Sequence, residues 1–242
     1  MNGVRMQEKS WRREDMNEII LRGLVVSCQA EGNSPFNSPQ MIFAFAKAAE
    51  MGGAVGVRLE GIKNIEYSAK KISVPIIGII KGKYENGEVL ITPRFEDAKN
   101  IVDAGARIIG IDATKRIRPD GSSSYEIIKR IKADLKIPVF ADVSTVMEGI
   151  DAVEAGANYV GTTLSGYTRY SKKKNDGPDL ELVSELSRIV KVPVFCEGKI
   201  RNPDDVAAAL DQGAYGVVVG TVITRPIKIV EMFIKPFKGI AR

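Results

Sequence analysis

Three apolar runs that open with proline each end in one ionisable side chain. The first run, 74–81, ends at Lys81, and the two others end at Asp142 and Glu197. Such runs are typical of buried parallel strands, whose carboxyl ends emerge together. Burial can bring a lysine amine close to neutrality, so that it takes a proton from a carbon next to a carbonyl. The pattern predicts a proton-transfer site at strand ends, with Lys81 as the first catalytic candidate.

Histidine is absent from all 242 residues. This removes the usual general base, the commonest metal ligand and the serine–histidine triad, and we therefore expect no metal centre. Proton transfer must then use lysine, aspartate, glutamate, tyrosine or cysteine. Cys28 and Cys196 lie inside apolar runs without metal-type spacing, so we expect reduced core thiols rather than a disulfide or a ligand pair.

The strand-like runs alternate with helix-like segments along the chain. Ser38 is a typical N-cap and Pro39 a typical first helical residue. The expected helices are 39–51, 61–71, 94–104, 123–133, 146–155, 180–189, 203–210 and 227–233, and the expected strands are 24–28, 54–60, 74–81, 107–112, 137–142, 159–163, 192–197 and 215–220. A short glycine-alanine repeat ends three helices just before a strand, at 103–106, 154–157 and 211–214. The repeat indicates a quasi-symmetric strand–helix assembly.

About eight strand–helix units in a chain of this length point to an α/β protein with a closed (β/α)8 TIM barrel. We expect a single barrel domain over 17–242, preceded by a flexible N-terminal extension over 1–16, where the sequence is polar and charged. An open doubly wound sheet is the alternative, but no glycine fingerprint follows the first strand.

In such a barrel the carboxyl ends of the strands line one mouth, where active sites are found. The sequence places the following polar residues there: Gln29, Arg58, Lys81, Asp112, Asp142, Thr163 and Glu197. Charges at a barrel mouth can pair for structural reasons alone. The convergence of an arginine, a lysine and acids without histidine nevertheless favours a functional site.

Two glycine-bearing strand exits, 197–203 and 220–226, precede expected helix starts. Backbone N–H groups and the helix dipole favour an anion at such places, and glycine allows close approach. Tight turns alone could also explain the glycines. Their occurrence after the seventh and eighth strands favours a phosphate site made by Gly198, Lys199, Gly220, Thr221 and Arg225.

The basic residues are scattered, although the net charge is +5. The one tight run, 172–174, is typical of a solvated loop rather than a nucleic-acid patch. No stretch reaches the roughly 20 apolar residues of a membrane span, and the N-terminus lacks the apolar core of a signal peptide. We expect a cytoplasmic protein with no nucleic-acid or membrane partner. The long loop 165–178 fits a lid over the site as well as it fits an unconstrained surface loop.

Nine ordered motifs resemble those of the N-acetylmannosamine-6-phosphate 2-epimerases, and the resemblance covers nearly the whole chain from about residue 17. The motifs lie at 26–30, 56–58, 78–81, 91–93, 110–114, 141–145, 161–168, 197–200 and 219–226. The resemblance implies conversion of N-acetylmannosamine 6-phosphate to N-acetylglucosamine 6-phosphate, in the catabolism of sialic acid and related amino sugars, without a cofactor.

The resemblance also implies roles for individual residues. Lys81 corresponds to the residue that removes and returns the C2 proton, and Glu197 to one that positions a substrate hydroxyl. The substrate-binding set is Gln29, Arg58, Asp142 and Thr163, of which Thr163 rests on its strand-end position alone, and Arg225 with the two glycine loops corresponds to the phosphate site. Cys196 and Lys199 depart mildly from the family pattern. Strand alternation predicts that Cys196 points away from the side of Glu197.

Two other functions fit the residues. One is a Schiff-base lyase or synthase that acts on a phosphosugar through Lys81. The other is a phosphosugar-binding module without catalysis. We also expect a homodimer, in which a partner covers the last helix.

Overall fold

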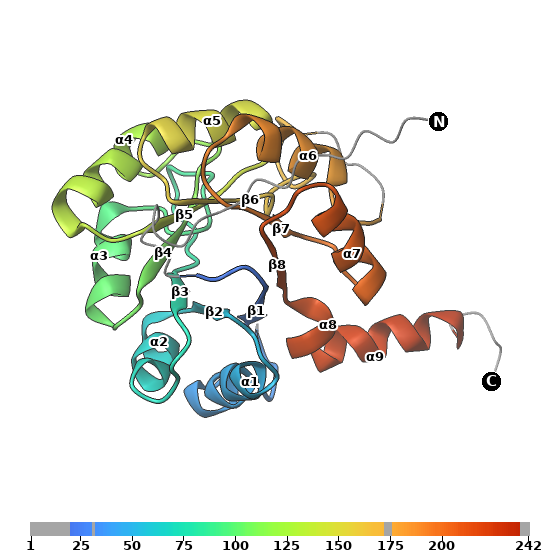
Figure 1. Cartoon of the computed structure of the whole chain (residues 1–242). Coiled ribbons are helices and arrows are strands. Elements are labelled where there is room, and N and C mark those ends of the chain that lie inside the picture. Colours follow the sequence, from blue (N-terminus) through green and yellow to red (C-terminus); the bar gives the residue numbers. More distant parts are fainter. Residues whose placement is uncertain (1–19, 31, 172–175, 238–242) are drawn as a thin grey trace, which may run out of the picture.

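Eight parallel strands close into a barrel in chain order, β1 to β8, and helices surround it (Figure 1). This computed structural model describes residues 20–30, 32–171 and 176–237. The closed barrel confirms the predicted (β/α)8 fold and excludes the open doubly wound sheet. The expected extension over 1–16 lies outside the described residues, as do residues 172–175 of the loop 165–178.

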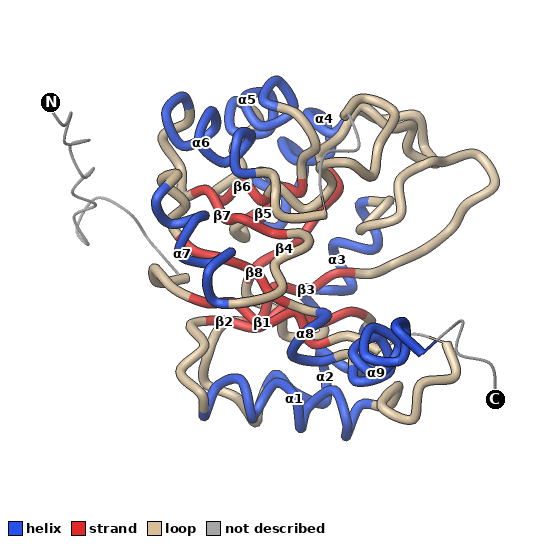
Figure 2. The backbone as a smooth tube through the Cα atoms, turned by 90° about the vertical axis from the view of Figure 1, so that its right-hand side faces the viewer, coloured by secondary structure: helices blue, strands red, loops and turns tan. Residues whose placement is uncertain are grey.

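The strands are short, and all neighbouring pairs are parallel. They are β1 (Leu24–Cys28), β2 (Gly56–Glu60), β3 (Ile76–Ile79), β4 (Ile108–Asp112), β5 (Val139–Asp142), β6 (Tyr159–Gly161), β7 (Val194–Glu197) and β8 (Gly216–Val219). In Figure 2 they form the centre of the molecule, with the helices outside. Parallel strands surrounded by helices on every side explain why the runs are almost continuously apolar.

The helices follow the strands as predicted. They are α1 (Pro39–Met51), α2 (Ile62–Ala69), α3 (Phe95–Asp103), α4 (Ser124–Arg130), α5 (Val146–Glu154), α6 (Leu180–Ile189), α7 (Pro203–Asp211), α8 (Thr221–Thr224) and α9 (Pro226–Ile234). The Ser38 side chain accepts a hydrogen bond from the Met41 amide, which confirms the predicted N-cap of α1. Sequence reasoning missed α8, a single turn, and the π-helical end Ile131–Leu135 of the fourth helix.

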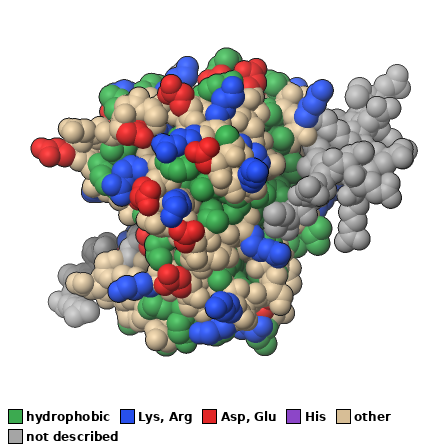
Figure 3. Space-filling model, turned by 90° about the vertical axis from the view of Figure 1, so that its left-hand side faces the viewer, with side chains coloured by type: hydrophobic (Ala, Val, Ile, Leu, Met, Phe, Trp, Pro, Cys, Tyr) green, Lys and Arg blue, Asp and Glu red, His purple; other side chains and the backbone are tan. Residues whose placement is uncertain are grey.

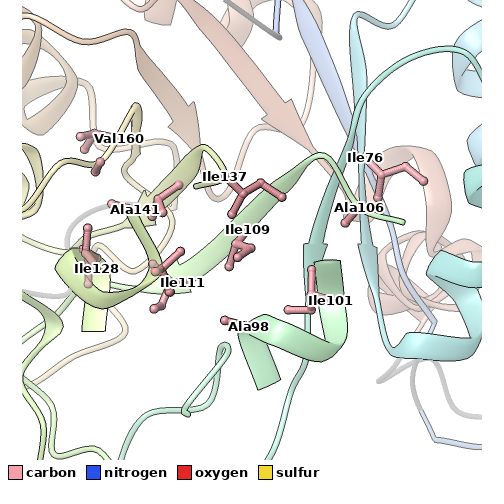
Figure 4. Close-up of a cluster of buried hydrophobic side chains, with 14 of the residues drawn as sticks. Ile76, Ala98, Ile101, Ala106, Ile109, Ile111, Ile128, Ile137, Ala141 and Val160 are labelled. Atoms are coloured by element: carbon pink, nitrogen blue, oxygen red, sulfur yellow. The ribbon is translucent and has the colours of Figure 1, made fainter. Parts of the chain in front are cut away.

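Apolar side chains pack in two layers, one inside the barrel and one between the strands and the helices. The inner layer includes Phe140 and Phe195, both without solvent exposure, whose ring centroids lie 5.5 Å apart. The outer layer packs the strands against the helices, as Figure 4 shows for Ile109 and Ile101. Each fully buried side chain of this size contributes about 2 kcal/mol to folding, so the layers make the barrel a rigid frame for its mouth.

Strand β3 carries the predicted base just beyond its end. Its side chains alternate, with Ile76 in the outer layer and Ile77 in the inner layer. Lys81 continues the inward row of Ile77 and Ile79, because side chains two residues apart share a face. The lysine pairs with Ile91 in an isolated antiparallel bridge.

Helix α9 differs from the helices that surround the barrel, because none of its residues is buried. It packs chiefly on α8 and on the short 3-10 turn Lys235–Phe237, and it extends outward from the barrel in Figure 1. Val230 is 54% exposed and Phe233 is 75% exposed. This helix therefore presents large apolar side chains to solvent.

Candidate active site

A cavity of about 820 Å³ opens at the carboxyl ends of the strands. The residues predicted at the mouth and in the phosphate loops line it, except Asp112 and Asp142; the lining members are Gln29, Arg58, Lys81, Thr163, Glu197, Gly198, Lys199, Gly220, Thr221 and Arg225. The closed barrel brings them together, although they are spread over almost 200 positions of the chain. Strand-end position was therefore the informative signal in the sequence.

Arg58, on β2, forms the centre of a buried polar cluster and is 1% exposed. Its guanidinium donates two hydrogen bonds to Asp142 at the end of β5, from Nη1 to Oδ1 at 2.8 Å and from Nη2 to Oδ2 at 2.6 Å. Nη1 also donates to Glu197 Oε2 at 3.2 Å. Burial opposes the charge of Arg58, but the carboxylates of Asp142 and Glu197 outweigh burial and raise its pKa above the ordinary value.

Asp142 lies beneath the cavity rather than on its wall, because its side chain has no solvent exposure. Both of its carboxylate oxygens bond to the Arg58 fork, a geometry that fixes the guanidinium plane. The geometry favours a role for Asp142 in holding Arg58 in place over a direct substrate contact.

Thr163 links the two carboxylates at the cavity floor. Its Oγ1 lies 2.6 Å from Asp142 Oδ1 and 3.0 Å from Glu197 Oε2. A hydroxyl has one proton, so it can donate to only one carboxylate at a time. Both contacts can be hydrogen bonds at the same time if Thr163 donates to Asp142 and a protonated Glu197 donates a hydrogen bond to Thr163 Oγ1. The geometry therefore suits a protonated Glu197.

The electrostatics of Glu197 agree with this geometry. Its side chain is 12% exposed. Burial raises the pKa of Glu197 to about 7, and the charge of Arg58 only partly offsets this effect. The nearby Asp142 carboxylate raises the pKa further, while the charge of Lys81 and a hydrogen bond donated by Thr163 to the ionised carboxylate lower it. A carboxyl with a pKa near 7 can both donate and accept a proton at neutral pH.

Lys81 enters the same cavity from the end of β3. Its backbone N–H donates to Glu60 Oε1 at 3.3 Å, which helps to hold the strand exit. Next to it, the side chains of Ile79, Ile91 and Leu164 form a small apolar cluster on the cavity wall. The polar amine of Lys81 therefore lies beside apolar side chains. Sequence reasoning did not predict that Ile91 and Leu164 would line the cavity.

Gln29 follows β1 and is 6% exposed. Its Nε2 donates to Ser27 Oγ at 2.8 Å, while its buried Oε1 has no hydrogen-bond partner among the described residues. A buried carbonyl oxygen of this kind is costly unless something donates to it. Since Gln29 lines the cavity, its Oε1 is suited to accept a hydrogen bond from a polar ligand.

The two glycine loops lie on the cavity wall after β7 and β8. Gly198 and Lys199 have φ values of 111° and 59°, in the left-handed region that favours glycine. Thr221 begins α8, where the first backbone N–H groups have no partner within the helix. Arg225 follows this turn and lines the same cavity. The loops thus present backbone donors and cationic side chains to the cavity.

Sequence reasoning missed several residues that line the cavity: Ser27, Tyr167, Arg201, Lys228 and Lys235. Lys228 and Lys235 belong to α9 and the turn after it, so their position depends on the path of α9 out of the barrel. No strand-end pattern marks them.

Asp112 does not lie where the sequence predicted. It ends β4, but it is not among the lining residues and has no solvent exposure. Its carboxylate accepts hydrogen bonds from the Thr114 amide and hydroxyl and forms an ion pair with Arg116. These local partners turn Asp112 into the loop after β4, which removes it from the mouth.

Cys28 and Cys196 are free and buried, as predicted. Cys196 packs in a cluster with Val183 and Ala209 and does not line the cavity, whereas Glu197 does, which confirms the expected alternation along β7. Burial raises the pKa of both thiols to about 12, so neither is poised as a nucleophile.

Over 20–30, 32–171 and 176–237, no group of three or more histidine, cysteine, aspartate or glutamate side chains is arranged to hold a metal ion. In the same part of the chain, no helix has the length and apolar character needed to span a membrane. On the face shown in Figure 3, basic and acidic side chains are interspersed.

The barrel and its polar mouth define a (β/α)8-barrel enzyme. The chain belongs to a family described as "Putative N-acetylmannosamine-6-phosphate epimerase", whose model matches residues 42–239. The match begins within α1, after β1, and runs through the rest of the barrel to the end of the described residues, and it confirms the resemblance seen in the motifs.

Individual similar proteins carry the same name as the family. A protein of Caldanaerobacter subterraneus subsp. tengcongensis, named putative N-acetylmannosamine-6-phosphate 2-epimerase, is 47% identical over 221 residues, which is 91% of this chain and 93% of that protein. A Clostridium perfringens protein of the same name is 42% identical over 218 residues, or 90% and 98% of the two chains.

A solved structure of the N-acetylmannosamine-6-phosphate 2-epimerase from Clostridium perfringens superimposes with a TM-score of 0.85. It is 40% identical and covers 90% of this chain and 94% of its own. Thiamine phosphate pyrophosphorylase from Pyrococcus furiosus matches with a TM-score of 0.54 at 16% identity, and this likeness shows the fold alone.

Proposed function

We propose that this chain is an isomerase that interconverts N-acetylmannosamine 6-phosphate and N-acetylglucosamine 6-phosphate, in the catabolism of sialic acid and related amino sugars. Family membership supports the substrate and the reaction. One observation carries the chemistry: Lys81 and Glu197 line one cavity together with two glycine loops that bear cationic side chains. A proton-transfer pair and an anion site in one cavity are what an epimerase of a phosphorylated sugar requires.

The two sugars differ only in configuration at C2. In the open-chain sugar C2 lies next to the C1 aldehyde, so removal of its proton leaves a planar intermediate whose charge is shared with the C1 oxygen. Lys81 takes the C2 proton, the planar intermediate turns about its C2–C3 bond, and Lys81 returns the proton to the opposite face. Lys81 is exposed to solvent in the free protein, and the apolar side chains of Ile79, Ile91 and Leu164 form the cavity wall beside it.

Glu197 acts as the second proton-carrying group. Because its pKa is raised to about 7, its carboxyl can donate a hydrogen bond to a substrate hydroxyl or carbonyl oxygen. Arg58, Asp142 and Thr163 hold this carboxyl in place through the hydrogen bonds described above. Arg58 and Thr163 also line the cavity and contact substrate, as does Gln29, whereas Asp142 positions Arg58 from below.

The 6-phosphate binds at the other side of the cavity, on the loops after β7 and β8. The groups proposed to hold it are Gly198, Lys199, Gly220, Thr221 and Arg225. Backbone N–H groups at a helix start and nearby cationic side chains both favour a phosphate. Anchoring the phosphate there leaves C2 to reach Lys81 across the barrel mouth.

The test is hydrogen exchange at C2. Incubating the protein with N-acetylmannosamine 6-phosphate in D₂O should replace the C2 hydrogen by deuterium, seen by NMR, while both epimers form. Lys81→Ala should slow exchange by about 10²–10⁴-fold. Lys83→Ala removes an exposed lysine two residues further along and is the matched control, with exchange unchanged.

Each outcome separates one proposal from another. A wild-type protein that binds the sugar phosphate without exchange would identify a binding module. Full activity of Lys81→Ala would reject Lys81 as the base. Inactivation of the wild type by borohydride only when substrate is present would point to a Schiff base on lysine instead.

We also propose that the protein is a homodimer that buries α9. Exposed apolar residues recur along α9 at spacings of three and four, at Ile227, Val230 and Ile234, and Ile223 on α8 and Phe237 on the following turn are exposed as well. Such a stripe is typical of a helix that packs against another helix. A two-fold axis would bring the same stripe of a second copy against it.

Light scattering after gel filtration tests the dimer. The wild type should have twice the mass of one chain, and Val230→Glu should yield the single-chain mass. Met147→Glu, at an exposed apolar residue of α5, should remain a dimer. A monomeric wild type would refute the proposal.

A cytoplasmic location is part of the same proposal, because a charged sugar phosphate does not cross a membrane unaided. Cell fractionation with an antibody to the protein checks it, and recovery in the secreted fraction would contradict it.

A further inference from the structure

The barrel wall between β3 and β4 is interrupted at its carboxyl end. The two strands pair directly only at residues 77–78 and 108–109. Beyond these pairs, backbone hydrogen bonds from residues 91 and 92 reach both strands. We call residues 91–92 the insert. They belong to the motif 91–93, which the proposed chemistry leaves without a role.

Toward β3, the insert holds the segment that carries the proposed base. Ile91 forms the antiparallel bridge with Lys81 itself. The Thr92 amide donates to the carbonyl oxygen of Ile80 at 2.7 Å. The backbone on the amino side of Lys81 and the lysine's own backbone therefore both depend on this short insert.

Toward β4, the insert is tied by a side chain as well as by the backbone. The Thr92 hydroxyl donates to the Gly110 carbonyl oxygen at 2.6 Å, and the Asp112 amide donates to the Ile91 carbonyl oxygen at 3.1 Å. Thr92 thus joins Ile80, just after β3, to Gly110 on β4. A single residue with no solvent exposure links the exit of β3 to the rigid wall of β4.

The backbone of Thr92 is strained. Its φ is 47°, in the left-handed region that a β-branched residue rarely adopts. Arg118, 1% exposed, holds this conformation by donating from Nη1 to the carbonyl oxygens of Thr92 and Pro93 at 3.1 and 3.0 Å. Arg118 also donates from Nη2 to the Asp112 carbonyl oxygen. Such outliers persist only where surrounding bonds enforce them, and they gather at functional sites.

We propose that Thr92 is a positioning residue for the proton transfer: through its hydroxyl bond to Gly110 and its amide bond to Ile80, it fixes the backbone from which Lys81 reaches C2. The inference rests on the proposed function. Glycine would relieve the strain at this φ but has no hydroxyl, and serine would keep the hydroxyl. The side-chain oxygen is therefore the feature that the substitutions below isolate.

The consequence is a specific kinetic signature. The proposed phosphate loops follow β7 and β8, on the other side of the barrel mouth from the insert. Loosening Lys81 should therefore lower kcat and leave KM nearly unchanged. A displacement of about 1 Å at a reacting group can cost about 100-fold in rate, so a smaller shift should cost about 10- to 100-fold.

Three variants at this position and one control test the proposal in the exchange assay. Thr92→Val keeps the β-branched shape but removes the hydroxyl, and kcat should fall by about 10- to 100-fold while KM changes by less than about threefold. Thr92→Ser should restore kcat to within about threefold of the wild type. Thr145→Val is the matched control, since it removes the half-buried threonine cap of α5, away from β3; its melting temperature should fall with kcat unchanged.

Thr92→Gly guards against a valine variant that does not fold, because glycine adopts this φ without strain. It should fold and lose kcat as valine does. A wild-type kcat in folded Thr92→Val or Thr92→Gly would overturn the proposal. A loss of kcat in Thr92→Ser as large as that in Thr92→Val would overturn it as well. Absence of exchange in the wild-type protein would instead reject the proposed function, and the positioning role with it.

Discussion

The buried carboxyl of Glu197 should make the stability of the protein fall as pH rises. Its pKa is about 7 in the folded protein against an ordinary value of 4.5. Between these values the folded protein holds a proton that the unfolded chain has lost. The resulting stabilisation is fully present below about pH 4.5 and is lost as pH rises through about 7.

The size of this effect follows from the gap between the two pKa values. One pKa unit corresponds to about 1.4 kcal/mol, so a gap of roughly 2.5 units is worth about 3 kcal/mol between pH 4 and pH 8. Glu197→Gln cannot ionise, yet its amide can still accept from Arg58 and donate to Thr163. Relative to the wild type, the variant should therefore gain about 3 kcal/mol as pH rises from 4 to 8.

Urea unfolding at one-unit steps from pH 4 to pH 8 measures this difference. Protein concentration and ionic strength are held constant, because a dimer's apparent stability depends on concentration. Glu66→Gln, at an exposed glutamate on α2, is the matched control, and its curve should run parallel to that of the wild type. Parallel curves for the wild type and Glu197→Gln, within about 0.5 kcal/mol, would refute the reasoning.

The remaining predictions concern the rest of the cavity. Asp142→Asn removes the main partner of a buried guanidinium, so urea unfolding should show a loss of about 3–5 kcal/mol, and a loss below about 1 kcal/mol would contradict the buried pairing with Arg58. Gly198→Ala strains a backbone at φ 111° in the proposed phosphate loop. It should raise KM for the sugar phosphate about tenfold or more with little change in kcat, and unchanged KM would argue against that loop. Deletion of residues 2–16 should leave Tm and kcat unchanged, and lower values of either would place those residues in the folded unit.

Strand-end positions could be predicted from the sequence because the barrel converts chain order into geometry. Lys81 shares its face with Ile77 and Ile79, and Glu197 lies one residue after the outward-facing Cys196, so alternation alone placed both at the mouth. The closed barrel then brought them into one cavity. The apolar periodicity and the positions of proline and glycine were therefore sufficient to place these strand ends at the mouth.

The depth of each polar residue could not be predicted in this way. Asp112 and Asp142 are register partners on β4 and β5, yet one turns into its own loop and the other lies under the cavity. The difference comes from the partners that each carboxylate meets, Arg116 four residues away for Asp112 and Arg58 across the barrel for Asp142. Side-chain pairing of this kind leaves no periodic signal, and neither does the insertion of Thr92 between two strands.

The unequal sharing of Arg58 decides which carboxyl carries the proton. Asp142 receives both arms of the guanidinium at 2.8 and 2.6 Å, whereas Glu197 receives one arm at 3.2 Å. The single positive charge of Arg58 compensates the charge of Asp142, to which it is bonded twice. Ionisation of the second buried carboxyl, Glu197, is therefore unfavourable. Glu197 is also the member of the pair that reaches the cavity, while Asp142 lies beneath it. The cluster therefore favours a proton on Glu197, the proposed proton donor to the substrate, while Asp142 holds Arg58 from below.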